Sequence, residues 1–262
     1  MRIKEITTFL EEFAPLEYQE SYDNCGLIVG DANAEVKGAL ITLDCTEEIV
    51  DEAIVAGCNL IIAHHPIIFS GLKKLNGSNY IERTVIKAIK NDIAIYACHT
   101  NLDNVHNGVS AEIAAKIGLV NCKVLRPRIT ENSQLVGPGI LGELKNPVNS
   151  TDFLKFVKGT MQTDCIRHTA LVKDEIKTVA VCGGSGSFLL QNAIDEKVDI
   201  FITADFKYHE FFDAENHIII ADIGHYESEQ FTKELIYDLL TKNFTKFAIR
   251  LSKVNTNPIK YL

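Results

Sequence analysis

The 262-residue sequence has no tryptophan, two methionines and six prolines, and it lacks long apolar runs. Its apolar stretches fall far short of the roughly 18 residues that a membrane-spanning helix needs. The first residues, Met1 to Glu5, are charged rather than continuously apolar, so they do not resemble a secretory signal. Apolar residues make up 46% and charged residues 23%, which excludes collagen-like, coiled-coil and low-complexity classes. We therefore expect a globular, cytoplasmic protein with no membrane partner.

Basic residues are also in short supply. Lysine and arginine number 26 against 35 acidic residues, which gives a formal charge of −9. Proteins that hold nucleic-acid backbones do so with clustered lysine and arginine, so nucleic acid is not an expected partner. The acidic excess and the eight histidines suit divalent cations, although solubility alone is the more ordinary reason for an acidic chain.

The seven cysteines include no Cys-x-x-Cys pair, and their number is odd. Neither a disulfide framework nor a thiolate zinc ribbon is expected. We interpret them as small buried residues in a reducing compartment.

Strands and helices alternate along most of the chain. A helix is predicted to begin at Asp44, with Glu47 three residues on as in a capping box, and to end at Gly57. Apolar strands are predicted at 39–43, 60–63, 93–97, 178–181, 199–203, 218–221 and 247–251. Helical connections of this kind imply crossovers, hence mostly parallel sheets. We predict an α/β fold of two lobes, about 1–127 and 128–262, with the proline-containing stretch 126–177 as a bridge.

Polar side chains follow four of these predicted strands. The segments are His64 to Pro66, Cys98 to Asp103, Ala204 to His209 and Asp222 to Glu229. In open α/β sheets, ligands bind beyond the carboxyl ends of strands. Imidazole and carboxylate together suit Zn, Mn, Fe, Co or Ni, so this edge predicts a metal site. Core histidines satisfied by hydrogen bonds are the alternative.

The two adjacent histidines indicate more than one metal. Neighbouring side chains of a strand point to opposite faces, so His64 and His65 diverge unless the chain turns at Pro66. Glu229 follows His225 by four residues, and a helix between them would turn its carboxylate back toward the metals as a bridge. The predicted ligands of two ions, with coordination positions left for water or substrate, are His64, His65, Asp103, His225 and Glu229.

Asp205 and His209 are the predicted catalytic residues, because hydrolysis needs a proton shuttle beside a metal-bound water. The alternative is that both are ordinary exposed polar residues. His99 and Thr100 precede a predicted ligand and are candidates to orient it by hydrogen bonding. Two roles remain open for the turn Gly183–Ser187: a phosphate cradle, or a tight strand-to-helix turn.

Four motifs carry a resemblance to the NIF-three-like family, whose members are named GTP cyclohydrolase I type 2 homologues. They are Ser21–Gly30, Ile61–Phe69, His99–Asp103 and Gly224–Glu229. Asp23 and Asn24 lie in the first motif, where turn formation explains them equally well. One departure is Ala204, where the family usually has glycine.

The resemblance implies a two-lobed α/β protein with a dinuclear metal site between the lobes, assembled as a toroidal homohexamer. It implies the same five ligands that the spacing predicts, with Glu229 as the bridge. Longer members carry an inserted third domain, whereas only about fifty residues lie between the lobes here, so a single domain of the short form is expected.

Two functions of different classes fit these patterns. One is a metal-dependent hydrolase of a nucleotide-like or phosphoester small molecule, in which two divalent ions activate a water. The other is a non-catalytic metal-binding or regulatory module that presents a hexameric ring to partners. Nitrogen and oxygen ligands do not by themselves distinguish zinc from iron, manganese, cobalt or nickel.

Overall fold

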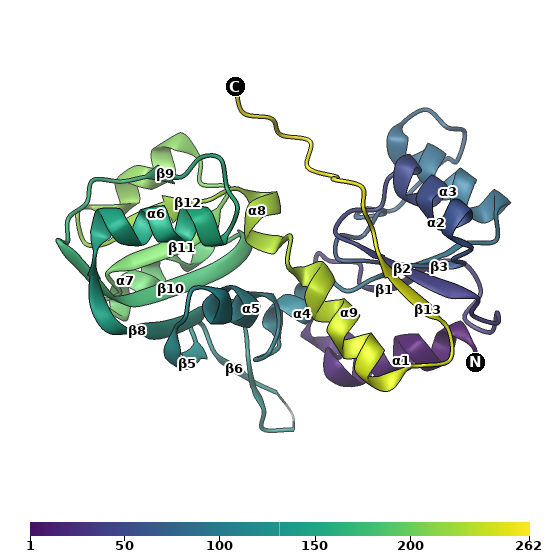
Figure 1. The fold of residues 1–262 in the computed structure, drawn as a ribbon, viewed down its shortest axis with the longest axis horizontal. Coiled ribbons are helices and arrows are strands. Elements are labelled where there is room, and N and C mark those ends of the chain that lie inside the picture. Colours follow the sequence, from purple (N-terminus) through teal and green to yellow (C-terminus); the bar gives the residue numbers. More distant parts are fainter. Residues whose placement is uncertain (131) are drawn as a thin grey trace. The chain divides into compact units, whose positions relative to one another are not determined.

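The computed structural model describes residues 1–130 and 132–262, and it divides the chain into two compact units (Figure 1). The first unit comprises Met1–Leu102 and Thr232–Pro258, and the second comprises Asp103–Phe231 and Ile259–Leu262. These boundaries differ from the predicted lobes of about 1–127 and 128–262. One reason is that β13 (Ala248–Leu251) pairs with β2 (Gly38–Thr42), which draws a late segment into the first unit. The other is that residues 120–124 pair with residues 140–143 of the second unit.

The first unit is built on a five-stranded sheet of order β1-β4-β3-β2-β13. Its other strands are β1 (Gly26–Val29), β3 (Leu60–Ala63) and β4 (Ala94–Ala97). The strands β13, β2, β3 and β4 are parallel, while β1 runs antiparallel to β4. Thr42 pairs with Ala63, and Ala63 with Ala97. The chain therefore leaves β2, β3 and β4 at neighbouring points of one edge.

Helices cover both faces of this sheet (Figure 1). They are α1 (Ile3–Phe13), the 3₁₀ helix η1 (Leu16–Tyr18), α2 (Glu47–Ala56), α3 (Tyr80–Lys90) and α9 (Thr232–Asn243), with α4 (Thr100–Asn104) at the boundary between the units. Helices α2 and α3 bury Ile49, Val50 and Val85 against Leu40, Ile61 and Ile95. Strand β3 is buried along its whole length, as its continuous apolar sequence predicts for a parallel strand covered on both faces.

The ends of α2 test the capping prediction. Gly57 closes the helix in the left-handed conformation with φ 69°, as predicted. The predicted start at Asp44 is wrong, because Thr46 is the N-cap residue and the helix begins at Glu47. The Asp44 carboxylate instead contacts a histidine ring, described below.

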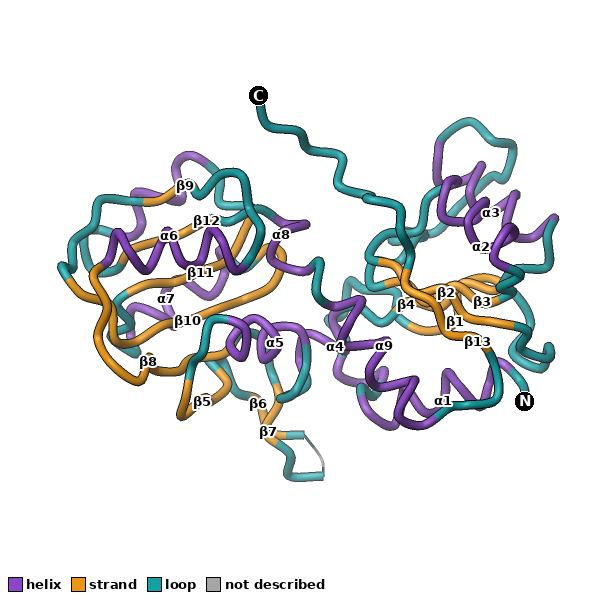
Figure 2. The backbone as a smooth tube through the Cα atoms, viewed as in Figure 1, coloured by secondary structure: helices purple, strands orange, loops and turns teal. Residues whose placement is uncertain are grey.

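The second unit contains a six-stranded sheet of order β5-β8-β10-β11-β12-β9 and a small β6-β7 hairpin (Figure 2). The strands are β5 (Val120–Val124), β6 (Arg128–Ile129), β7 (Leu135–Val136), β8 (Ile140–Asn149), β9 (Arg167–His168), β10 (Glu175–Ser185), β11 (Ile200–Ala204) and β12 (Ile219–Asp222). The helices are α5 (Val109–Lys116), α6 (Ser150–Thr160), η2 (Ser187–Leu189), α7 (Leu190–Asp195), η3 (Tyr208–Ala214) and α8 (His225–Glu229).

Alternate residues of these strands face opposite sides, as the pleat requires. Val179, Val181 and Ile200 pack with α5 and α6, whereas Ala180 and Phe201 pack with α7 and η3. None of the described helices has both the length and the hydropathy of a membrane span.

The prediction of mostly parallel sheets holds for the first sheet, where only β1 pairs antiparallel, but in the second sheet it holds only for the centre. β10, β11 and β12 are parallel, but β8 and β9 pair antiparallel with their neighbours. The stretch 126–177 is therefore not a bridge between lobes, because it supplies β8 and α6 to the second unit. Antiparallel pairing needs no helical crossover, so the strand-helix alternation that predicts parallel strands does not apply to β8 and β9.

Candidate metal centre

Three histidines gather at the strand edge of the first unit. His64 and His65 follow β3, and His99 follows β4, whose ends are adjacent in the sheet. The three ring centroids lie 4.9 to 5.3 Å apart. Each ring can offer one nitrogen, with the three ligand atoms within 4.8 Å of one another. The ends of β3 and β4 thus bring together His64 and His65, which are two of the predicted ligands, and His99.

Every one of these rings is held at its Nδ1 atom by an oxygen. The three contacts, each 2.8 Å long, join His64 to the carbonyl of Cys98, His65 to Oδ1 of Asp44 and His99 to Oδ1 of Asp23. Because carbonyl and carboxylate oxygens only accept, the ring Nδ1 atom donates, and in the neutral ring Nε2 then keeps the lone pair. This is the tautomer and the second hydrogen bond that metal-ligating histidines have in proteins.

The Asp23 carboxylate is fully buried behind His99. Burial alone would raise its pKa, but hydrogen bonds from His99 and Thr100 outweigh burial and hold the pKa of Asp23 far below its usual range. Thr100 donates both its backbone N–H and its hydroxyl to Oδ2 of Asp23. Thr100 therefore supports His99 through Asp23. Asp23 therefore does more than form a turn, because its carboxylate holds the His99 ring. The Ser21–Gly30 motif, which contains Asp23, is the sequence signal for this role.

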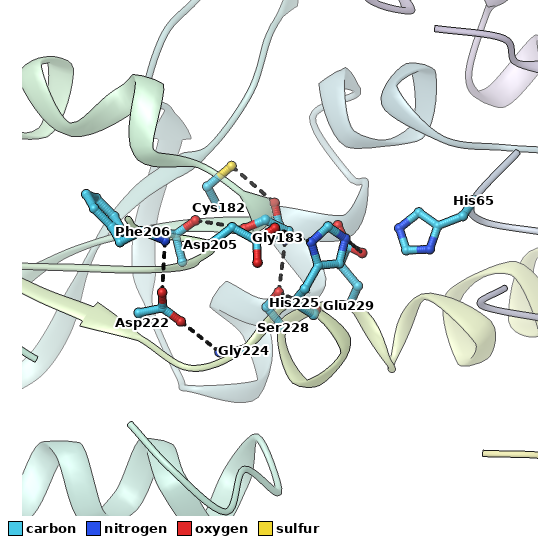
Figure 3. Close-up of polar contacts among 12 residues, drawn as sticks. His65, Cys182, Gly183, Asp205, Phe206, Asp222, Gly224, His225, Ser228 and Glu229 are labelled. Atoms are coloured by element: carbon cyan, nitrogen blue, oxygen red, sulfur yellow. Dashed lines mark hydrogen bonds and ion pairs between the residues drawn. The ribbon is translucent and has the colours of Figure 1, made fainter. Parts of the chain in front are cut away.

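In the second unit, His225 and Glu229 stand one turn apart on α8. His225 Nε2 lies 3.1 Å from Glu229 Oε2, and His225 Nδ1 lies 2.7 Å from Asp205 Oδ2 (Figure 3). Burial disfavours the charged ring, but the Glu229 and Asp205 carboxylates outweigh burial and raise the pKa of His225 to about 11. The ring is thus an imidazolium between two carboxylates at neutral pH, at a nitrogen where a divalent cation can take the place of the proton.

A buried aspartate fixes the two loops that carry this pair. Asp222 ends β12, where it pairs with Thr203 of β11. Its Oδ2 accepts from Phe206 N–H at 2.9 Å, and its Oδ1 accepts from Gly224 N–H at 3.1 Å (Figure 3). The same Oδ2 atom also accepts from the Arg167 guanidinium. One loop presents Asp205, in the left-handed conformation with φ 60°, and the other leads into His225.

The glycine pair Gly183-Gly184 makes room for Glu229. A Cβ atom on Gly184 would lie 2.2 Å from Oε1 of Glu229, and Gly184 has φ +60°. The N–H of Gly184 donates to the Ser228 hydroxyl at 2.9 Å. The turn therefore serves the close approach of a buried carboxylate, and that N–H is already used within the protein instead of facing a phosphate.

The remaining predicted residues are placed as follows. Asp103 lies on α4. Burial raises the pKa of the Cys182 thiol in the second unit, and the charges of Asp103 and Glu229 raise it further. His209 is exposed on η3, where its ring packs against Tyr208 and Phe212. Within the described residues, the groups of candidate ligands do not include His209.

Imidazole nitrogens and carboxylate oxygens of this kind fit a divalent transition metal. The fit rests on the histidine rings, whose Nδ1 atoms are all occupied by oxygens within 2.8 Å. Oriented imidazole nitrogens together with carboxylate oxygens are ligands that Zn, Mn, Fe, Co and Ni accept. The fold and the site thus define an α/β protein with histidine and carboxylate groups able to bind a metal ion.

Residues 1–258 match the family described as Duf34/NIF3 (NGG1p interacting factor 3). The chain belongs to this family, which confirms the resemblance found in its motifs. A relative from Clostridium acetobutylicum, named GTP cyclohydrolase 1 type 2 homolog, is 32% identical over 269 residues, covering 100% of this chain and 99% of the relative. A Staphylococcus aureus (strain MSSA476) relative of the same name is 27% identical over an alignment of 368 residues that covers both chains completely.

Solved structures show the same fold. The crystal structure of Staphylococcus aureus protein SA1388 superposes with a TM-score of 0.90 at 30% identity, over 100% of this chain and 99% of that one. A Bacillus cereus protein related to NIF3 superposes with a TM-score of 0.93 at 25% identity and the same coverage.

Proposed function

We propose that this protein binds two divalent metal ions and uses a metal-activated water to hydrolyse a nucleotide-like or phosphoester substrate. The observation that supports this most strongly is that three histidines, each held at Nδ1 by an oxygen, can offer ligand atoms within 4.8 Å of one another, which is the arrangement of metal-ligating histidines. The name of the clostridial relative, GTP cyclohydrolase 1 type 2 homolog, also points to a nucleotide.

In this proposal five residues would hold the two ions. They are His64, His65, Asp103, His225 and Glu229, with the Glu229 carboxylate shared by the two ions. When bound, the ions would lower the pKa of a coordinated water and polarise the bond that it attacks. Asp44 and Asp23 orient rings of the first unit, and Asp205 orients His225 in the second.

We propose a positioning role for Asp205 in place of the predicted catalytic one. Its carboxylate already binds the ring of a proposed ligand, so we assign it to orienting His225. The contacts of His209 among the described residues are aromatic, and His209 remains the candidate to move a proton near the substrate. We also propose the toroidal homohexamer and a cytoplasmic location, both on family resemblance.

The test combines metal analysis with a screen for turnover. Protein loaded separately with Zn²⁺, Mn²⁺, Fe²⁺, Co²⁺ and Ni²⁺ is assayed on nucleotides, phosphoesters and cyclic amides, with Glu229→Gln as the matched inactive control. Turnover that depends on metal and is lost in the control supports the hydrolase. Two bound ions with no turnover on any substrate would favour the non-catalytic metal-binding module.

A further inference from the structure

The segment after β13 runs past the candidate metal ligands of the first unit. β13 is the parallel neighbour of β2, with Leu251 paired to Ile41, and Ser252 N–H donates to the Ile41 carbonyl at 2.8 Å. Parallel strands end at the same edge of a sheet, so this segment emerges beside the end of β2. We call residues 252–258 the C-terminal strap.

Two acidic side chains fasten the strap. Glu52 of α2 accepts from the Ser252 hydroxyl at 2.5 Å and from Lys253 N–H at 2.9 Å. Farther along, the Thr256 hydroxyl donates to Oδ2 of Asp44 at 2.6 Å. The first contact involves none of the residues that hold the histidine rings, whereas the second involves the carboxylate that holds His65.

Asp44 lies between the strap and the histidine. Its Oδ1 atom accepts from His65 Nδ1 at 2.8 Å, while Oδ2 accepts from Thr256. The backbone around it is also fixed: the Thr42 hydroxyl donates to the Asp44 carbonyl at 2.8 Å, and His65 N–H donates to Leu43 at 2.9 Å. With its backbone held, the remaining freedom of Asp44 is rotation of the carboxylate, which the Thr256 hydroxyl restrains.

We propose that Thr256 is a positioning residue for the metal ligand His65, acting through Asp44. The Thr256 hydroxyl donates to Oδ2 of Asp44, so Oδ1 stays aligned with the His65 ring. Oδ1 then accepts from Nδ1–H, and Nε2 is the ligating atom. The proposal rests on the proposed metal-binding function, although the orientation of His65 in metal-free protein can be tested separately.

The first experiment measures Co²⁺ affinity by competition with a chromogenic chelator. Groups that hold a ligating histidine typically contribute about 10- to 100-fold to affinity, so Asp44→Asn should lose that much. Thr256→Val keeps the shape of the side chain but removes the hydroxyl donor. Because Thr256 acts on His65 only through Asp44, we expect a smaller loss of Co²⁺ affinity, about 3- to 10-fold. Thr256→Ser retains the donor and should restore affinity to within about twofold of wild type. Ser252→Ala is the matched control, because it weakens the strap at Glu52 without touching Asp44.

The second experiment reads the His65 ring without metal. Long-range ¹H–¹⁵N spectra, assigned through loss of the signal in His65→Gln, should show the Nδ1–H form in wild type and Thr256→Ser and a shift toward the other tautomer in Thr256→Val. Wild-type affinity and a wild-type tautomer in Thr256→Val would overturn the proposal. Equal loss in Ser252→Ala would overturn it too, since the strap would then act only through general stability. If wild-type protein binds none of Zn²⁺, Mn²⁺, Fe²⁺, Co²⁺ and Ni²⁺, the metal-binding function fails, and the ring spectra still decide whether Thr256 positions His65.

Discussion

The Nδ1 atom of His225 lies 2.7 Å from Oδ2 of Asp205, so a candidate ligand and a predicted catalytic residue form one hydrogen-bonded pair. The pair joins the end of β11 to the start of α8, and Asp222 fixes the loops on either side. A substitution at Asp205 is therefore expected to change metal binding directly, through the orientation of His225.

Asp205→Asn should lower metal affinity by about 10- to 100-fold, because the amide holds the His225 ring less firmly than a carboxylate does. Chelator competition with Zn²⁺ measures the change. His209→Ala is the matched variant from the same loop region, and it should keep wild-type metal content because the described contacts of His209 are aromatic. Wild-type affinity in Asp205→Asn would remove the orienting role.

Metal uptake should release a proton from His225. The pKa of this ring is raised to about 11 in metal-free protein, so at pH 7 the ring is protonated and must lose its proton to bind a metal. Affinity should therefore rise with pH and metal should be lost on acidification. Calorimetry in buffers of different ionisation enthalpy measures the proton count, and a count of zero at pH 7 would contradict this arrangement.

The stability of the metal-free protein should have the opposite pH dependence. The folded-state pKa of His225 is raised from 6.5 to about 11, so the ion pairs with Glu229 and Asp205 stabilise the fold fully below pH 6.5. That contribution declines as pH rises and is lost above about 11. Chemical denaturation of chelator-treated protein across this pH range measures how the free energy of unfolding changes with pH. The part of that change that is due to His225 should be absent in His225→Gln.

Wild-type protein should hold two divalent ions per chain, because five ligands with one bridge serve two ions. Glu229→Ala should lose both ions, since it removes the shared carboxylate, while Asp103→Ala should lose mainly one. Elemental analysis after dialysis gives the stoichiometry. A wild-type value near zero in metal-replete buffer at neutral pH would exclude the site.

Gly184→Ala should remove metal as well as stability. The new Cβ would meet Oε1 of Glu229 at 2.2 Å, and the residue has φ +60°. Gly57→Ala is the matched control, because Gly57 has φ +69° but no neighbour within 4 Å. Both variants should lose about 1–2 kcal/mol from left-handed strain, but only Gly184→Ala should lose metal affinity. Thermal unfolding and metal content separate the two effects, and normal metal content in Gly184→Ala would show that Glu229 has room to move.

Light scattering should report a mass of six chains, as the family resemblance implies. A monomer at micromolar concentration would contradict the ring.

Several local features could be predicted from the sequence because neighbouring residues determine them. The strand 60–63 is apolar throughout and is followed by two histidines, so its burial and the exit of His64 and His65 at the strand end were both predictable. The left-handed Gly57 is equally local, since it depends on residues within one helical turn.

Tertiary structure decided which groups hold the ligands. Local capping rules assign Asp44 to a helix start, yet its carboxylate holds His65, 21 positions away, and receives the hydroxyl of Thr256, 212 positions away. Asp23 and His99 are 76 positions apart. Residue spacing predicts a contact only within an element or between neighbouring turns, where geometry is fixed by the backbone period. The sequence by itself therefore determined which residues end the strands, whereas the order of strands in each sheet decided which distant carboxylates meet those residues, because hydrogen bonds form wherever folding brings a donor and an acceptor within about 3 Å.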